Sequence, residues 1–254
     1  MKKIISLILT LVLVFTAVAA FSSCNKMDKD TETQMRNINA MFETLVPSQS
    51  VTTVTQDMGA LVLTSVATLT MGTVDGNKAA TYVNEYEELA PLDGSNNANL
   101  IQKKTQILWY VEGRGLCKNA NGKWIADGED FRPEAGDIKL YLTANMLTSA
   151  EYDAATGTFT AVLDKNNANK LLADFLGEEQ RIASGLTLVI CTAGGRVSSL
   201  KLEYVEPAED LYIGEGDELD ASEEDLENNT ISIPESVVTI EIHYSYDAKV
   251  ITLN

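Results

Sequence analysis

Apolar and polar residues alternate along most of the chain with the two-residue period of a β-strand. The alternation is regular over 197–205 and 237–246, where one face of each segment is apolar and the other is polar. Such segments are typical of an antiparallel sheet with one face against a core and the other in water. The same pattern predicts further strands over 61–71, 79–89, 106–112, 116–118, 123–126, 158–163, 186–192 and 249–253.

Short turn sequences separate these segments. Asp75-Gly76-Asn77, residues 119–122, residues 193–196 and Asp247-Ala248 each join two of them. Gly and Asn readily adopt the left-handed conformation that tight hairpins need, so these positions predict β-hairpins. Segment 61–71 is rich in β-branched residues and has one distinctly more apolar face. That face is formed by Leu61, Leu63, Ala67, Leu69 and Met71.

Two segments change to the three- and four-residue spacing of a helix. The first carries Met35, Ile38, Phe42 and Leu45 on one face and ends at Pro47. The second is 166–179, with Asp164 or Asn166 as its N-cap. Its apolar stripe consists of Ala168, Leu171, Leu172, Phe175 and Leu176. Residues 140–152 fit either helix or strand, and Ala144, Met146 and Leu147 favour helix.

The first 23 residues have the composition of a secretion signal. Lys2 and Lys3 precede an apolar run over 4–20, and Phe21-Ser22-Ser23-Cys24 follows it. These last four residues resemble the bacterial lipobox. The resemblance implies cleavage before Cys24, lipidation of its sulfur and attachment of the protein to a membrane outside the cytoplasm, in a bacterial cell envelope.

Two alternatives to lipidation stay open. Ala17-Val18-Ala19 is an acceptable site for ordinary signal peptidase, which would release a soluble protein. The apolar run could also remain as a membrane span, although it is short of the ~20 residues that a span needs. With lipidation, residues 24–33 form a polar tether and 34–254 form a single domain.

The charge of the chain disfavours nucleic acid as a partner. The leader holds two lysines and no acid, so the mature chain has 17 basic and 37 acidic residues and a formal charge of −20. Phosphate backbones repel such a surface, and no basic stripe counters the repulsion. Eleven of the acids fall within 206–227, in a loop expected over 206–230. Calcium binding is one interpretation of this loop and a solvated coil is the favoured one.

Few residues could bind a metal or catalyse a reaction. Cys117, Cys191 and His243 are too few for a structural zinc site, and the two cysteines form either a disulfide or, as we favour, two separate thiols. His243 is expected on a polar strand face beside Glu241. No nucleophile elbow, phosphate loop or HExxH motif occurs. We therefore expect a monomer without a cofactor, a metal or an enzymatic activity.

Three stretches of the chain are similar to the LolA/LppX-like lipoprotein carriers. They are Trp109-Tyr110-Val111-Glu112 leading to Asn121-Gly122-Lys123-Trp124, then 159–163 followed by the helix over 171–176, and then 186–204. The resemblance implies an α+β, mainly β fold, in which a curved antiparallel sheet, or half-barrel, is built from hairpins and covered by helices. It also implies a cavity for a lipid or another apolar ligand. The lining candidates are Leu61, Leu63, Leu69, Trp109, Leu188, Leu200 and Leu202.

Two other functions stay open. The candidate lining residues could instead pack against the helices as a filled core, which would indicate an interaction or structural lipoprotein. A surface that binds a protein or glycan is the third possibility. Tyr82, Tyr86, Tyr244 and Tyr246 could serve such a surface.

Overall fold

The computed structural model describes residues 27–89, 101–113, 115–120, 123–126, 140–176, 181–212, 230–249 and 251. The signal sequence, Cys24, the link over 127–136 and most of the acidic loop lie outside the described residues. So does the side chain of Cys117.

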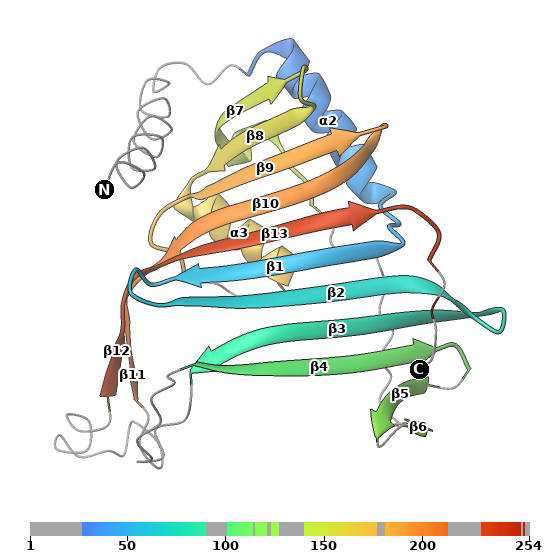
Figure 1. Cartoon of the computed structure of the whole chain (residues 1–254). Helices are drawn as coiled ribbons and strands as arrows, with labels where there is room; N and C mark the ends of the chain where they lie inside the picture. Colours follow the sequence, from blue (N-terminus) through green and yellow to red (C-terminus); the bar gives the residue numbers. More distant parts are fainter. Residues whose placement is uncertain are drawn as a thin grey trace, which may run out of the picture.

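Eleven strands form one antiparallel sheet in the order β6-β5-β4-β3-β2-β1-β13-β10-β9-β8-β7 (Figure 1). The sheet is mainly built from hairpins and does not close into a barrel, which confirms the predicted α+β, mainly β class. Two further strands, β11 (Glu209–Tyr212) and β12 (Thr230–Ile233), pair only with each other. The strands of the first half are β1 (Gln49–Asp57), β2 (Val62–Val74), β3 (Asn77–Leu89), β4 (Ile101–Val111), β5 (Gly115–Ala120) and β6 (Lys123–Ala126). Those of the second half are β7 (Leu147–Asp153), β8 (Thr158–Leu163), β9 (Leu186–Ala193), β10 (Arg196–Glu206) and β13 (Ser236–Ser245).

Strand β1 joins the two halves of the sheet, and the sequence pattern did not predict it. It pairs with β2 on one side and with β13 on the other, so that Val54 lies opposite both Ser65 and Ile240. Its residues are half-buried along nearly the whole strand, with no apolar face. Repeated Val and Thr are the only local signal for a strand here.

Both predicted helices are present and begin at an aspartate cap. Helix α2 (Lys29–Glu43) begins about five residues before its predicted start, because the Asp28 carboxylate accepts hydrogen bonds from the backbone N–H groups of Asp30 and Thr31. The last residues of the segment expected as a tether, from Lys29 to Thr33, therefore belong to this helix. Helix α3 (Lys165–Leu176) begins after Asp164, which accepts from the N–H groups of Asn166 and Asn167. No helix in the described ranges is long and apolar enough to cross a membrane.

Two other segments differ from their predictions. Residues 140–152, for which helix was favoured, contain only the 3-10 turn Ala144–Met146 before edge strand β7. Lys249 and Ile251 belong to no strand, although 249–253 was predicted to pair with 237–246. Strand β13 already pairs with β1 and β10, so neither of its edges can accept a returning strand.

The core lies between the two helices and one half of the sheet. Helix α2 contacts β7, β8 and β10, and Figure 1 shows α3 behind β10 and β13. Phe42 of α2 and Leu172 of α3 belong to the same cluster as Phe159 and Leu186, and each of these four is at most 2% exposed. This half of the domain is therefore filled with apolar side chains.

The two cysteines lie in distant parts of the sheet. Cys117 is in β5 and Cys191 is in β9, seven positions apart in the strand order. The thiol of Cys191 is free. The alternative of a Cys117–Cys191 disulfide is therefore wrong.

Candidate ligand-binding surface

The strand register defines which side chains share a face of the sheet. Residues directly opposite each other in an antiparallel pair point to the same face. Leu202 lies opposite both Leu188 and Ile240, and Ile240 lies opposite Val54 of β1. We call this helix-covered side the inner face and the opposite side the outer face.

Three of the predicted lining residues are in the filled core. Leu188, Leu200 and Leu202 are each 0% exposed and pack in one cluster with the apolar residues of α2 and α3. They contribute to the stability of the domain, and none of the three lines the pocket at the end of α2 that is described below.

The inner face changes character at β1. On β13 the inner-face residues Val238, Ile240 and Ile242 are at most 4% exposed. On β1 and β2 no described residue is buried, on either face. The covering by helices therefore ends near the centre of the sheet, and the inner face continues beyond it as a partly exposed surface.

An apolar row crosses this exposed part of the inner face. Leu69 of β2 lies opposite Tyr82 of β3, and Tyr82 lies opposite Leu108 of β4. All three are half-buried, and burial raises the pKa of the Tyr82 hydroxyl. A neighbouring row brings together Met71, Ala80 and Tyr110, of which Ala80 is buried. We call the five partly exposed residues Leu69, Met71, Tyr82, Leu108 and Tyr110 the open apolar rows.

Polar residues follow the open apolar rows on the same face. Ala67 lies opposite Asn84, which in turn lies opposite Gln106. The Ser65 hydroxyl donates a hydrogen bond to the Asn84 side-chain oxygen at 2.9 Å. The exposed inner face is thus apolar at one end and polar at the other.

The remaining lining candidates are only partly in these rows. Leu69 is a member, and Leu63 is half-buried on the same face of β2. Leu61 lies in the turn before β2, where its carbonyl accepts a hydrogen bond from the Met58 N–H at 2.9 Å.

Trp109 lies on the outer face, opposite to the face that carries the open apolar rows, and its role in ligand binding stays a prediction. It is opposite Thr81, and Thr81 is opposite Thr70, which shares the outer face with Gln49 and Ser245. Its neighbours Leu108 and Tyr110 point inward instead. The uninterrupted apolar run Ile107-Leu108-Trp109-Tyr110 contains no alternation from which the inward residues could have been recognised.

Tyr244 lies where the filled core meets the exposed part of the inner face. It is opposite Ser50, and Ser50 is opposite Leu69. Burial strongly raises the pKa of the Tyr244 hydroxyl, and the hydroxyl oxygen has no hydrogen-bond partner within the described part of the chain. A buried hydroxyl in this state costs about 1–3 kcal/mol relative to a paired one.

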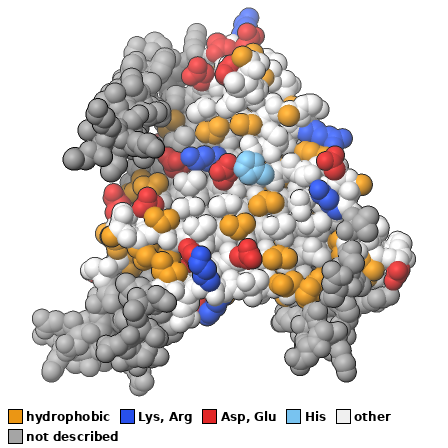
Figure 2. All heavy atoms as spheres, in the orientation of Figure 1, with side chains coloured by type: hydrophobic (Ala, Val, Ile, Leu, Met, Phe, Trp, Pro, Cys, Tyr) orange, Lys and Arg blue, Asp and Glu red, His pale blue; other side chains and the backbone are white. Residues whose placement is uncertain are grey.

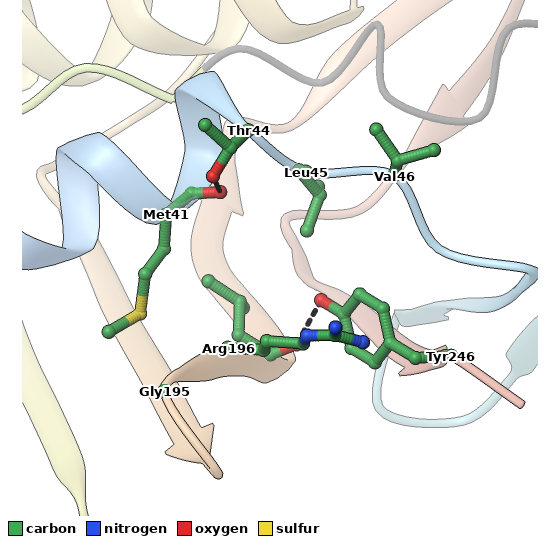
Figure 3. Close-up of a pocket in the computed structure, with 8 residues that line it drawn as sticks. Met41, Thr44, Leu45, Val46, Gly195, Arg196 and Tyr246 are labelled. Atoms are coloured by element: carbon green, nitrogen blue, oxygen red, sulfur yellow. Dashed lines mark hydrogen bonds between the residues drawn. The ribbon is translucent and has the colours of Figure 1, made fainter.

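A separate pocket of about 310 Å³ lies at the C-terminal end of α2. Met41, Leu45 and Val46 line one side of it, and Arg196 and Tyr246 line the other (Figure 3); Val197 also belongs to its lining. The Tyr246 hydroxyl donates a hydrogen bond to the Val197 carbonyl at 2.6 Å. The sequence analysis did not predict this pocket, because its residues come from three distant segments.

The outer face carries ion pairs together with exposed apolar residues, among them Val62, Ile107 and Val237. The His243 Nε2 lies 2.9 Å from a Glu241 carboxylate oxygen, and Lys201 Nζ lies 2.9 Å from Glu203. Figure 2 shows the histidine on this exposed surface among acidic and basic side chains. No group of three or more His, Cys, Asp or Glu side chains in the described residues is arranged to hold a metal ion.

Comparison with known proteins gives distant structural similarity only. No family model matches the chain, and no curated protein matches it. The crystal structure of LprF from Mycobacterium bovis aligns with 89% of this chain and 97% of its own, at 10% identity and a TM-score of 0.41. A DUF1329 family protein from Desulfovibrio piger aligns with 86% of this chain and 95% of its own, at 8% identity and a TM-score of 0.23. The fold class therefore rests on the strand order and helix packing described above.

Proposed function

We propose that this protein is anchored through Cys24 to a membrane of the bacterial cell envelope and binds an apolar ligand, a lipid or an acyl chain, without catalysing a reaction. The lipobox-like sequence at 21–24 supports the anchoring. The binding is supported by one observation above all, the row formed by Leu69, Tyr82 and Leu108 on the exposed part of the inner face.

An acyl chain fits the chemistry of this row. Side chains directly opposite on neighbouring strands lie about 5 Å apart, so the row forms a continuous apolar strip across three strands. Partly exposed apolar surface of this kind is typical of sites that contact a ligand or partner. Covering it removes apolar area from water, which contributes about 25 cal/mol per Å².

The polar surroundings of the row suit a ligand with a polar end. Ser65, Asn84 and Gln106 lie on the same face beyond Ala67. The Tyr244 hydroxyl lies in register with Leu69 through Ser50 and has no partner within the described residues. This hydroxyl oxygen is enclosed by the protein, so the polar groups that a ligand would meet on the exposed face are Ser65, Asn84 and Gln106.

Native mass spectrometry tests the proposal. Residues 25–254, which include every described helix and strand, are purified from a bacterial host, and co-purifying molecules are extracted with solvent. We expect an acyl lipid at near one-to-one stoichiometry. Leu69→Glu places a charge in the middle of the apolar row and should abolish the bound mass, because an ionised carboxylate is strongly disfavoured against an acyl chain.

Thr68→Glu is the matched control. It introduces the same charge at the adjacent position of β2, but on the outer face. Lipid retention in this variant together with loss in Leu69→Glu supports binding on the inner face. An unliganded mass for the unmodified protein, with no uptake of added fatty acid or phospholipid, overturns the proposal.

The complete burial of Leu188, Leu200 and Leu202 favours a second candidate. An interaction or structural lipoprotein needs a filled core and no small-molecule ligand, and the exposed part of the inner face would then contact another envelope protein. This candidate becomes the better one if the purified protein carries no lipid and takes up none when fatty acid or phospholipid is added.

A further inference from the structure

The pocket at the end of α2 combines an apolar wall with one arginine. Met41, Leu45 and Val46 supply apolar surface from α2 and the segment that follows it, and Val197 supplies it from the start of β10. Val46 is 76% exposed. A volume of about 310 Å³ is near the lower end of the range for small-molecule sites, so the pocket suits one short chain.

Tyr246 fixes the position of the arginine. The Arg196 guanidinium carbon lies 4.8 Å from the centre of the Tyr246 ring, within the range of a cation–π contact. The ring is itself held by the hydrogen bond from its hydroxyl to the Val197 carbonyl. Figure 3 shows the guanidinium alongside the ring at the pocket. The cation is therefore oriented before any ligand arrives, which lowers the entropic cost of binding.

The charge of Arg196 is not neutralised by a neighbouring acid. Arg36 and Arg181 pair with Glu32 and Glu209, whereas no carboxylate in the described part of the chain forms an ion pair with Arg196. This is notable in a protein with 37 acidic residues and a formal charge of −18. A guanidinium presents two parallel N–H groups that match the two oxygens of a carboxylate.

We propose that the pocket binds the carboxylate end of a single-chain fatty acid. The carboxylate accepts hydrogen bonds from Arg196, and the methylene groups next to it lie against Met41, Leu45 and Val197. The inference rests on the proposed function for the class of ligand. The pocket shares no residue with the open apolar rows, so binding at one site can be lost while binding at the other is kept.

Isothermal titration with three probes tests the site. The probes are decanoate, decanol and acetate below the micellar concentration, added to residues 25–254. Decanoate should bind more tightly than decanol and acetate, because only decanoate supplies both the charge and the chain. Arg196→Gln should weaken decanoate by about tenfold or more and leave decanol nearly unchanged.

Arg36→Gln is the matched control, because it removes an exposed arginine from α2, the helix whose C-terminal end lines the pocket. It should leave decanoate binding unchanged. Val46→Asp is a second test at an exposed position, where an added negative charge should weaken decanoate without affecting the fold. The proposal is overturned if Arg196→Gln binds decanoate as tightly as the unmodified protein, or if decanol binds as tightly as decanoate.

Leu69→Glu separates the two sites. Loss of decanoate in Leu69→Glu with full binding in Arg196→Gln rejects the pocket and retains the proposed function. Loss in Arg196→Gln with full binding in Leu69→Glu supports the pocket. If no probe binds to any variant, both proposals are rejected for fatty acids.

Discussion

Asn39 of α2 holds the backbone of Leu142 by two hydrogen bonds. Its amide nitrogen donates to the Leu142 carbonyl at 2.7 Å, and its amide oxygen accepts from the Leu142 N–H at 2.9 Å. Asn39 is 7% exposed and Leu142 is 1% exposed. The pair joins segments 103 residues apart and attaches the approach to β7 to the helix that covers it.

Asn39→Ala should destabilise the domain by about 2–4 kcal/mol. The substitution leaves a buried carbonyl and a buried N–H without partners, and each costs about 1–3 kcal/mol when unpaired. Urea unfolding followed by circular dichroism measures the change. Asn37→Ala is the control, because Asn37 is exposed on the same helix and its side chain donates a hydrogen bond to that of Gln34. Equal effects of the two substitutions would contradict the role given to Asn39.

The sequence predicted the covered half of the sheet well. On β9, β10 and β13 one face is fully buried, so a shift of one residue would place apolar side chains in water, and the alternation is strict. Leu188, Leu200 and Leu202 were therefore assigned to the inner face correctly. Whether that face encloses a cavity depends on how closely the helices approach it, and periodicity contains no such information.

The uncovered half was predicted less well for a physical reason. Where both faces are partly exposed, neither face must be apolar, so the pattern around Trp109 does not define its direction. Strand β1 was missed for the same reason. The Arg196 pocket depends on contacts between α2, the β9–β10 turn and the end of β13, and no local pattern specifies them.

Gly72→Ala should loosen the C-terminal segment. A Cβ at position 72 would lie 2.7 Å from the Lys249 carbonyl oxygen and 3.1 Å from Ile251 Cγ1. Ile251 packs with Ala79 and Val111, so displacing it exposes a small apolar cluster. We expect a loss of about 1–3 kcal/mol, typical of overpacking. Hydrogen exchange of the backbone amides around 249–251 should become faster.

Thr73→Ala provides the comparison for Gly72→Ala, because Thr73 is the next residue of β2 and is exposed. It should leave the exchange rates of the C-terminal amides unchanged. Unchanged exchange in Gly72→Ala would mean that the segment does not pack against β2 in solution.

Glu206 should make the domain less stable as the pH rises above the ordinary carboxyl range. Burial raises the pKa of Glu206 above its usual 4.5, and the hydrogen bonds from Ser236 and Gln56 oppose this only in part. The folded state then binds a proton more tightly than the unfolded chain. The stabilisation that Glu206 contributes is therefore complete below the pKa of this carboxyl in the unfolded chain. It is lost as the pH rises through the pKa of the same carboxyl in the folded state.

Glu206→Gln therefore should stabilise the domain at pH 7 relative to the unmodified protein, and should have less effect at pH 4. The glutamine keeps an oxygen that can accept from Gln56 and Ser236 but cannot acquire the buried charge. Unfolding midpoints in urea at the two pH values measure the difference. Glu203→Gln on the same strand is the control, because Glu203 lies on the outer face and pairs with Lys201. If Glu206→Gln changed the midpoint equally at both pH values, the ionisation of Glu206 would not be coupled to folding, and its effect would come from packing alone.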